Sequence, residues 1–168
     1  MMVHKAFISV GSNLGDPLYN CCWGIDILCQ DSDVLLVARS PFYRTAPVDY
    51  LQQDWFVNAA LLVETTLTPF ELLDRTQAIQ ARMGRKKDAI RFGPRVLDLD
   101  LIFYEDQVIR APHLVVPHPR MHKRRFVLHP ICDIDPLVVH PVLGHTVREI
   151  LEQLPPDSQN MVPCSSGC

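Results

Sequence analysis

The sequence lacks long apolar runs, and none approaches the roughly 20 residues that a helix needs to span a bilayer. The segment before the first apolar stretch, Met1–Lys5, is too short to supply the core of a signal peptide. Charge of one sign is also scarce, because the net charge is −3 over 168 residues, which argues against a general nucleic-acid coat. We therefore expect a cytoplasmic protein that binds neither membranes nor nucleic acid.

Paired cysteine motifs are absent too. The six cysteines form no Cys-x-x-Cys pair and show no spacing that indicates a disulfide framework or a zinc site. We expect reduced thiols, and a poorly ordered C-terminal tail at 155–168 that carries Cys164 and Cys168. Residues 1–154 are numerous enough to bury one core, and we expect them to form a single domain.

An acidic pair stands out among the residues that are present. Every odd position from Leu97 to Phe103 is apolar, which predicts a strand with Asp98 and Asp100 on one face. Ile102 and Tyr104 are expected to continue that face as apolar positions. The Cα atoms of the two acids would lie roughly 6.5 Å apart. Carboxylate oxygens suit Mg²⁺, which takes substrate phosphates as further ligands, so the pattern predicts a magnesium site.

Two basic clusters flank this pair. Six of the 16 lysines and arginines lie in residues 82–95 and four more in residues 120–125. In a protein close to neutral, two such clusters indicate one compact anionic ligand, which arginine would clamp through paired hydrogen bonds. Each basic side chain taken singly is equally consistent with a solvated surface. The candidate phosphate clamps are Arg85, Arg95 and Arg124, with Lys87 as a weaker contributor.

The predicted elements alternate in a recognisable order. Asp16 before Pro17, and Thr68 before Pro69, are helix-start signals. The order strand, helix, strand, strand, helix, strand predicts a ferredoxin-like split β-α-β fold of the α+β class, with helices packed on an antiparallel sheet. The glycine-containing turn at 11–15 precedes no Gly-Lys-Ser/Thr, so we interpret it as a tight turn. The predicted strands are 6–10, 34–43, 56–64, 97–103 and 107–109, and the predicted helices include 69–83 and 146–154.

Aromatic and amide side chains suggest a second ligand. Phe56 and Phe126 adjoin the basic segments and could stack on a planar heterocycle, although both could equally be core residues. Asn58 shares the strand face of Phe56 and could offer a donor and an acceptor to a heteroaromatic edge. His118 could bond a phosphate or serve a structural role.

Five segments, in this order, carry a resemblance to a known family. The chain resembles the 6-hydroxymethyl-7,8-dihydropterin pyrophosphokinases of folate biosynthesis, and the similarity extends to about Leu154. The Arg-x-Gly-Pro-Arg-x-x-Asp-Leu-Asp block is the most specific of the shared motifs. The segments are Gly11–Gly15, Tyr43–Pro47, Phe56–Ala60, Gly93–Asp100 and Val116–Met121.

The resemblance implies transfer of pyrophosphate from ATP to the hydroxymethyl group of a reduced pterin, with release of AMP. It implies two Mg²⁺ ions on Asp98 and Asp100, which with Arg85 and Arg95 form the catalytic set. We expect the enzyme to be a monomer. The implied ATP contacts are Gln77, Arg85, Lys87, Arg95, Leu101, His118 and Arg124. The implied pterin contacts are Thr45, Ala46, Val48, Phe56, Asn58 and Phe126.

Two departures and two alternatives stay open. Gln80 stands where many relatives carry an acid, and Phe92 where several carry Trp. A ferredoxin-like RNA-binding module would need exposed aromatics in a Lys/Arg-Gly-Phe-like strand motif, which this sequence lacks. A catalytically inactive ligand-sensing domain is the other alternative, and variants of the two aspartates would distinguish it from an enzyme.

Overall fold

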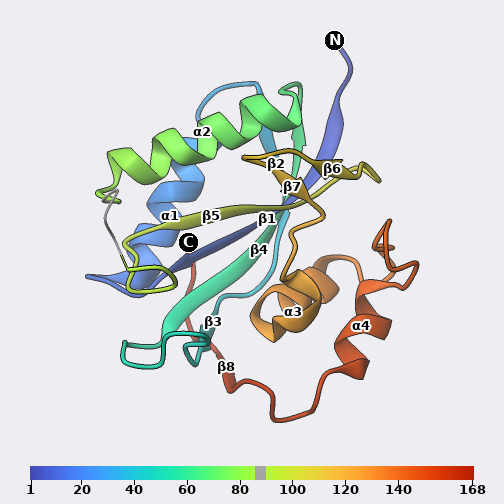
Figure 1. The fold of residues 1–168 in the computed structure, drawn as a ribbon. Coiled ribbons are helices and arrows are strands. Elements are labelled where there is room, and N and C mark those ends of the chain that lie inside the picture. The colour runs from blue at the N-terminus through green and yellow to red at the C-terminus, as the bar shows by residue number, and fades with distance from the viewer. Residues whose placement is uncertain (86–89) are drawn as a thin grey trace.

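The computed structural model of the chain describes residues 1–85 and 90–168 (Figure 1). Within them the main sheet has six strands in the order β5-β1-β4-β3-β8, with β2 also on β4, and every pairing is antiparallel. This confirms the expected ferredoxin-like α+β fold. The elements are β1 (His4–Ser12), α1 (Pro17–Leu28), β2 (Val34–Arg39), β3 (Tyr43–Thr45), β4 (Phe56–Thr65), α2 (Pro69–Arg82), β5 (Asp98–Tyr104), β6 (Ile109–Arg110), β7 (Val115–Val116), a short 3₁₀ turn (Met121–Lys123), α3 (Arg125–Ile134), α4 (Val147–Gln153) and β8 (Met161–Pro163).

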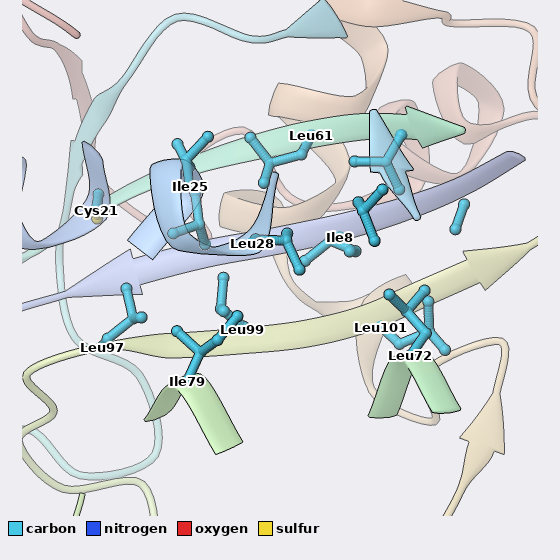
Figure 2. Close-up of a cluster of buried hydrophobic side chains, with 14 of the residues drawn as sticks. Ile8, Cys21, Ile25, Leu28, Leu61, Leu72, Ile79, Leu97, Leu99 and Leu101 are labelled. Carbon is cyan, nitrogen blue, oxygen red and sulfur yellow. The ribbon is translucent and has the colours of Figure 1, made fainter. Parts of the chain in front are cut away.

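The sheet separates two apolar layers. Helices α1 and α2 cover one face, and α3 and α4 lie against the other (Figure 1). Each fully buried aliphatic side chain in such a layer contributes about 1.5–3 kcal/mol to folding. Figure 2 shows the first layer, where side chains of α1, of α2 and of three strands meet: Ile25 and Leu28, Leu72 and Ile79, and Ile8, Leu61 and Leu99.

Both predicted helix starts are confirmed. The Asp16 side chain accepts a hydrogen bond from the Tyr19 N–H at the start of α1. Thr68 and Glu71 form a reciprocal capping box at the start of α2. These side chains satisfy backbone donors that have no partner within the helix, so local chemistry fixes where each helix begins.

The predicted strand 34–43 is interrupted, and this part of the prediction was wrong. β2 ends at Arg39 and β3 begins at Tyr43, although both pair with β4. Pro41 has no N–H to donate to the ladder. The Ser40 hydroxyl instead accepts a hydrogen bond from the Ala60 N–H at 2.9 Å. The break divides one long strand into two.

A β-bulge in β5 overturns another expectation. The register shifts between Phe7 and Ile8 of β1, where Phe7 faces Phe103 and Ile8 faces Leu101. Ile102 is therefore the extra residue of the bulge, and the alternation of side chains changes after it. Tyr104 consequently packs in the layer under α1 and α2, on the face opposite Asp98 and Asp100, and not on their face as predicted.

The C-terminal tail is ordered, contrary to expectation. Strand β8 pairs with β3, whose outer backbone groups would otherwise lack partners. Cys168 forms a disulfide with Cys22 of α1, so the expectation of reduced thiols was wrong for this pair. No helix in the two described ranges is long and apolar enough to cross a membrane.

Candidate active site

The register across β1 aligns the acidic pair with the predicted pterin amide. Gly11 lies opposite Asn58 of β4 on one side and opposite Asp98 of β5 on the other. Residues directly opposite each other in an antiparallel sheet share a face, so Asn58 and Asp98 point to the same side. A Cβ atom on Gly11 would lie 2.3 Å from the Asn58 Oδ1 atom. A larger residue at position 11 would therefore displace the Asn58 amide.

The next row of the sheet repeats this arrangement. Ser9 lies opposite Ala60 on one side and Asp100 on the other, on the same face as Gly11. A cavity of about 390 Å³ opens over these two rows. Its walls come from β1, β4 and β5, from the loops at 46–49 and 91–95, from residues 118–126, and from Gln159 in the tail.

The two carboxylates of Asp98 and Asp100 repel each other in a partly buried position. Burial raises the pKa of Asp98, and repulsion by Asp100 raises it further. Burial likewise raises the pKa of Asp100, while Arg124 opposes that rise. The Arg85 Nη1 atom lies 3.2 Å from the Asp98 Oδ1 atom, which offsets part of the negative charge. Such a pair is more stable with a cation between or beside its members.

The donor set fits Mg²⁺. Among the described residues, no group of three or more His, Cys, Asp and Glu side chains could hold a metal ion. Asp98 and Asp100 offer two carboxylates on one face, which would leave other coordination positions of a bound ion to water and to ligand oxygens. Mg²⁺ is commonly bound in this way, by one or two carboxylates and by substrate phosphates.

Backbone and amide groups orient Arg85 and Arg95. Arg85 Nη1 donates to Gln80 Oε1 at 3.0 Å, and the same oxygen accepts from the Leu99 N–H at 2.8 Å. Gln80 thus connects α2, β5 and the first arginine. Arg95 Nη1 donates to the carbonyls of three residues of its own loop, Ile90, Gly93 and Pro94, at 3.0, 3.3 and 3.1 Å.

Asn13, in the turn at 11–15, makes hydrogen bonds to two loops of the cavity. Asn13 Oδ1 accepts from the Arg95 N–H at 2.8 Å, and Asn13 Nδ2 donates to Gln53 Oε1 at 3.0 Å. Gln53 Nε2 in turn donates to the Phe92 carbonyl at 2.8 Å. Two amide side chains therefore hold the loops on either side of the cavity together. The interpretation as a simple tight turn missed this, because the partners are distant in the sequence.

Arg124 carries an internal counter-ion. Asp49 Oδ2 lies 3.4 Å from Arg124 Nη2 and 3.7 Å from Arg120 Nη1. The two guanidinium groups also lie over the ring of Phe92, at 5.6 and 4.3 Å from its centroid. Phe92 adopts a left-handed backbone conformation with φ 58°, which bulky residues rarely adopt.

His118 is held as a neutral hydrogen-bond donor. Burial, followed by the nearby charge of Arg124, lowers the pKa of His118 to about 4. Its Nδ1 atom accepts from the Arg120 N–H at 3.1 Å, so the proton of the neutral ring is on Nε2. An uncharged imidazole in this tautomer can donate to a ligand oxygen.

The predicted pterin residues all line this same cavity. Phe56 and Phe126 both line it, from β4 and from the start of α3. Asn58 Nδ2 donates to Thr45 Oγ1 at 2.6 Å, which fixes the amide orientation. Both rings are only partly buried, and Phe126 also packs against the apolar layer under α3 and α4.

Most predicted site residues line this one cavity, but two of those that the structure describes do not. Gln77 is exposed on α2 and does not line it, and Leu101 is buried in the layer under the helices with 5% of its surface exposed. Lys87 lies outside the described residues. The predicted residues that line the cavity are Thr45, Ala46, Val48, Phe56, Asn58, Arg85, Arg95, Asp98, Asp100, His118, Arg124 and Phe126.

Known proteins resemble the chain in sequence and in fold. The family model described as 7,8-dihydro-6-hydroxymethylpterin-pyrophosphokinase matches residues 7–136. A protein named 2-amino-4-hydroxy-6-hydroxymethyldihydropteridine pyrophosphokinase from Methylorubrum extorquens is 40% identical over 152 residues, which is 90% of this chain and 94% of that protein. A protein of the same name from Bacillus subtilis is 41% identical over 133 residues, 79% of each chain.

The fold comparison agrees. A crystal structure of Plasmodium falciparum HPPK-DHPS with pteroate has a TM-score of 0.73 at 14% identity. The match covers 90% of this chain but only 42% of that longer chain, and at this identity it shows the fold alone. The sequence matches carry the assignment. This chain belongs to the 7,8-dihydro-6-hydroxymethylpterin-pyrophosphokinase family.

Proposed function

We propose that the chain transfers the pyrophosphate group of ATP to the hydroxymethyl group of 6-hydroxymethyl-7,8-dihydropterin and releases AMP, as a step of folate biosynthesis. The observation that carries this proposal is the alignment of Asn58, Gly11 and Asp98 in one row across the sheet. It places an amide suited to a heteroaromatic edge beside a carboxylate pair suited to metal-bound phosphates. Both lie in a single cavity.

We further propose that Asp98 and Asp100 hold two Mg²⁺ ions. Bound by these two carboxylates, Mg²⁺ would offset the negative charge of the phosphates in the transition state. The two carboxylates share one face of β5, so their oxygens can serve either ion. Arg85 and Arg95 then face the remaining phosphate charge, with orientations set by Gln80 and by the loop carbonyls. His118 would donate its Nε2 proton to a phosphate oxygen.

The pterin is proposed to lie between Phe56 and Phe126, with Asn58 at its edge. Stacked rings favour a planar heterocycle, and a side-chain amide supplies both a donor and an acceptor. This placement directs the hydroxymethyl oxygen toward the acidic pair. That oxygen attacks the β-phosphorus, the bond from the β-phosphorus to the oxygen linking it to the α-phosphate breaks, and AMP leaves.

Alignment of the two substrates carries most of the proposed catalysis. In the cavity, as lined by the described residues, His118 is the only imidazole, and its low pKa makes it a weak base. The hydroxyl proton therefore passes to solvent or to a phosphate oxygen and not to a dedicated side chain. We also propose that the enzyme acts as a monomer in the cytoplasm.

The experiment that tests this function replaces each metal ligand. We expect Asp98→Ala and Asp100→Ala to lower kcat by at least about 100-fold, because each removes a ligand to the ions that neutralise the transition state. Circular dichroism should show both variants folded. Asp106→Ala, at an exposed position in the turn after β5, is the matched control and should keep wild-type turnover. Near-normal rates in either active-site variant would remove the metal role.

A further inference from the structure

A glutamine in the C-terminal tail bonds to both walls of the proposed pterin slot. Gln159 lines the cavity, and it is half-buried. Its Nε2 atom donates to the Ala46 carbonyl at 2.6 Å, and its Oε1 atom accepts from the Phe126 N–H at 3.0 Å. One side chain therefore spans from the loop after β3 to the first turn of α3.

The tail occupies both backbone groups of Ala46. In addition to the carbonyl bond from Gln159, the Ala46 N–H donates to the Asn160 carbonyl at 2.9 Å. The resemblance implied that the Ala46 backbone contacts the pterin. In this structure both the N–H and the carbonyl of Ala46 bond to the tail, so the tail helps to determine where this part of the slot lies.

The bond to Phe126 has a similar consequence. Phe126 is in the first turn of α3, where backbone N–H groups have no acceptor within the helix. Gln159 supplies that acceptor, and no side-chain cap is made by Arg124, the residue that precedes the helix. The position of the Phe126 ring over the slot thus depends on a residue 33 positions later in the chain.

From these contacts we propose that Gln159 is a positioning residue of the pterin site, which fixes the spacing between the Ala46 loop and the Phe126 ring. The inference rests on the proposed pterin slot. It concerns a residue beyond those that the family model matches, which end at residue 136. Glutamine suits the role because a single amide can donate and accept at the same time.

The tail is anchored on both sides of Gln159. Before it, Arg125 Nη2 donates to the Pro155 carbonyl at 2.9 Å and Arg125 Nε donates to Ser158 Oγ at 3.2 Å. After it, β8 pairs with β3, and the Cys164 N–H donates to the Phe42 carbonyl at 2.8 Å. The Gln159 amide is therefore presented from a backbone with little freedom, which a positioning role requires.

The test is a comparison of two Michaelis constants in the full-length enzyme. We expect Gln159→Ala to raise KM for 6-hydroxymethyl-7,8-dihydropterin about tenfold, because two hydrogen bonds that fix the slot are lost, and to leave KM for ATP within about twofold. Gln159→Glu keeps the acceptor for Phe126 but places an oxygen against the Ala46 carbonyl. It should raise the pterin KM by an intermediate factor. Asp157→Ala, at an exposed position of the same tail, is the control and should change neither constant.

The outcomes separate this inference from the proposed function. A pterin KM unchanged in both Gln159 variants would overturn it, as would equal rises in the two Michaelis constants, which a general loss of structure would cause. If Gln159→Ala shows a lowered thermal midpoint, the pterin KM of Gln159→Glu becomes the test. An unchanged pterin KM in Gln159→Glu would then overturn the inference. Failure of the unmodified chain to form AMP would instead contradict the proposed function itself.

Discussion

At the scale of single residues, the candidate site holds like charges close together, where a ligand of opposite charge could neutralise them. Asp98 and Asp100 lie side by side in a partly buried position, and both have raised pKa values. Arg124 and Arg120 share the carboxylate of Asp49. Each arrangement leaves charge that a metal-bound polyphosphate would satisfy better than the protein does. Groups selected for ligand binding in this way commonly reduce the stability of the free protein.

Asp98→Asn should stabilise the metal-free protein while abolishing turnover. A raised carboxyl pKa means that the folded state binds the proton more tightly than the unfolded state, so stability falls as pH rises from the ordinary value near 4 through the raised folded value. Asp98→Asn has no carboxylate to ionise, so it removes this loss of stability at high pH. We expect the free energy of unfolding in urea to rise by about 1 kcal/mol at pH 8, with a smaller gain at pH 5. The expected gain is small because 33% of the Asp98 side chain is exposed, so solvent screens its charge.

The pH dependence makes this prediction specific. Asp106→Asn, at an exposed turn position, should show no such gain at either pH. If Asp98→Asn proved less stable at pH 8, the ion pair with Arg85 would outweigh the repulsion from Asp100, and the electrostatic account of the pair would be wrong.

Asp49→Asn should strengthen ATP binding. Without the carboxylate, the guanidinium groups of Arg124 and Arg120 no longer share their charge with the protein before the phosphates bind. Partly exposed ion pairs contribute up to about 1 kcal/mol, so KM for ATP should fall by no more than about fivefold. Asp54→Asn, an exposed acid of the same loop, is the control. A higher KM for ATP would show that Asp49 positions the arginines and does not compete for them.

At the scale of elements, local patterns predicted what depends on neighbours in the sequence. The common face of Asp98 and Asp100 followed from strand alternation, and both helix starts followed from capping chemistry. The register that aligns Asn58, Gly11 and Asp98 could not be predicted, because it depends on pairing between strands that are far apart in the chain. The bulge at Ile102 and the pairing of β8 with β3 have the same non-local origin. Gln159 was missed for this reason.

The disulfide provides a test of the tail as an element. Cys22 and Cys168 are 146 residues apart, so their link restricts the unfolded chain strongly. Cys168→Ser should lower the free energy of unfolding by about 2–4 kcal/mol in oxidising buffer. The wild-type protein with a reductant should match the variant. Equal stability of oxidised wild type and variant would show that the tail is not linked to α1 in solution.

At the scale of the whole molecule, the two faces of the sheet have separate roles. One face is fully packed by α1 and α2, while the other is shared between the layer under α3 and α4 and the open cavity. The packed face gives a rigid platform, and loops from distant parts of the chain close over the other face. The C-terminal tail contributes Gln159 to this second face, so a residue beyond those that the family model matches reaches the site.

The identity of the nucleotide product tests the central claim most directly. With Mg²⁺, ATP and 6-hydroxymethyl-7,8-dihydropterin, attack at the β-phosphorus must release AMP in a one-to-one ratio with the pyrophosphorylated pterin, because the bond between the α-phosphate and the β-phosphorus is the one that breaks. Chromatography of the nucleotides should therefore show AMP that depends on the pterin. ADP as the product, or no pterin-dependent turnover, would contradict the account.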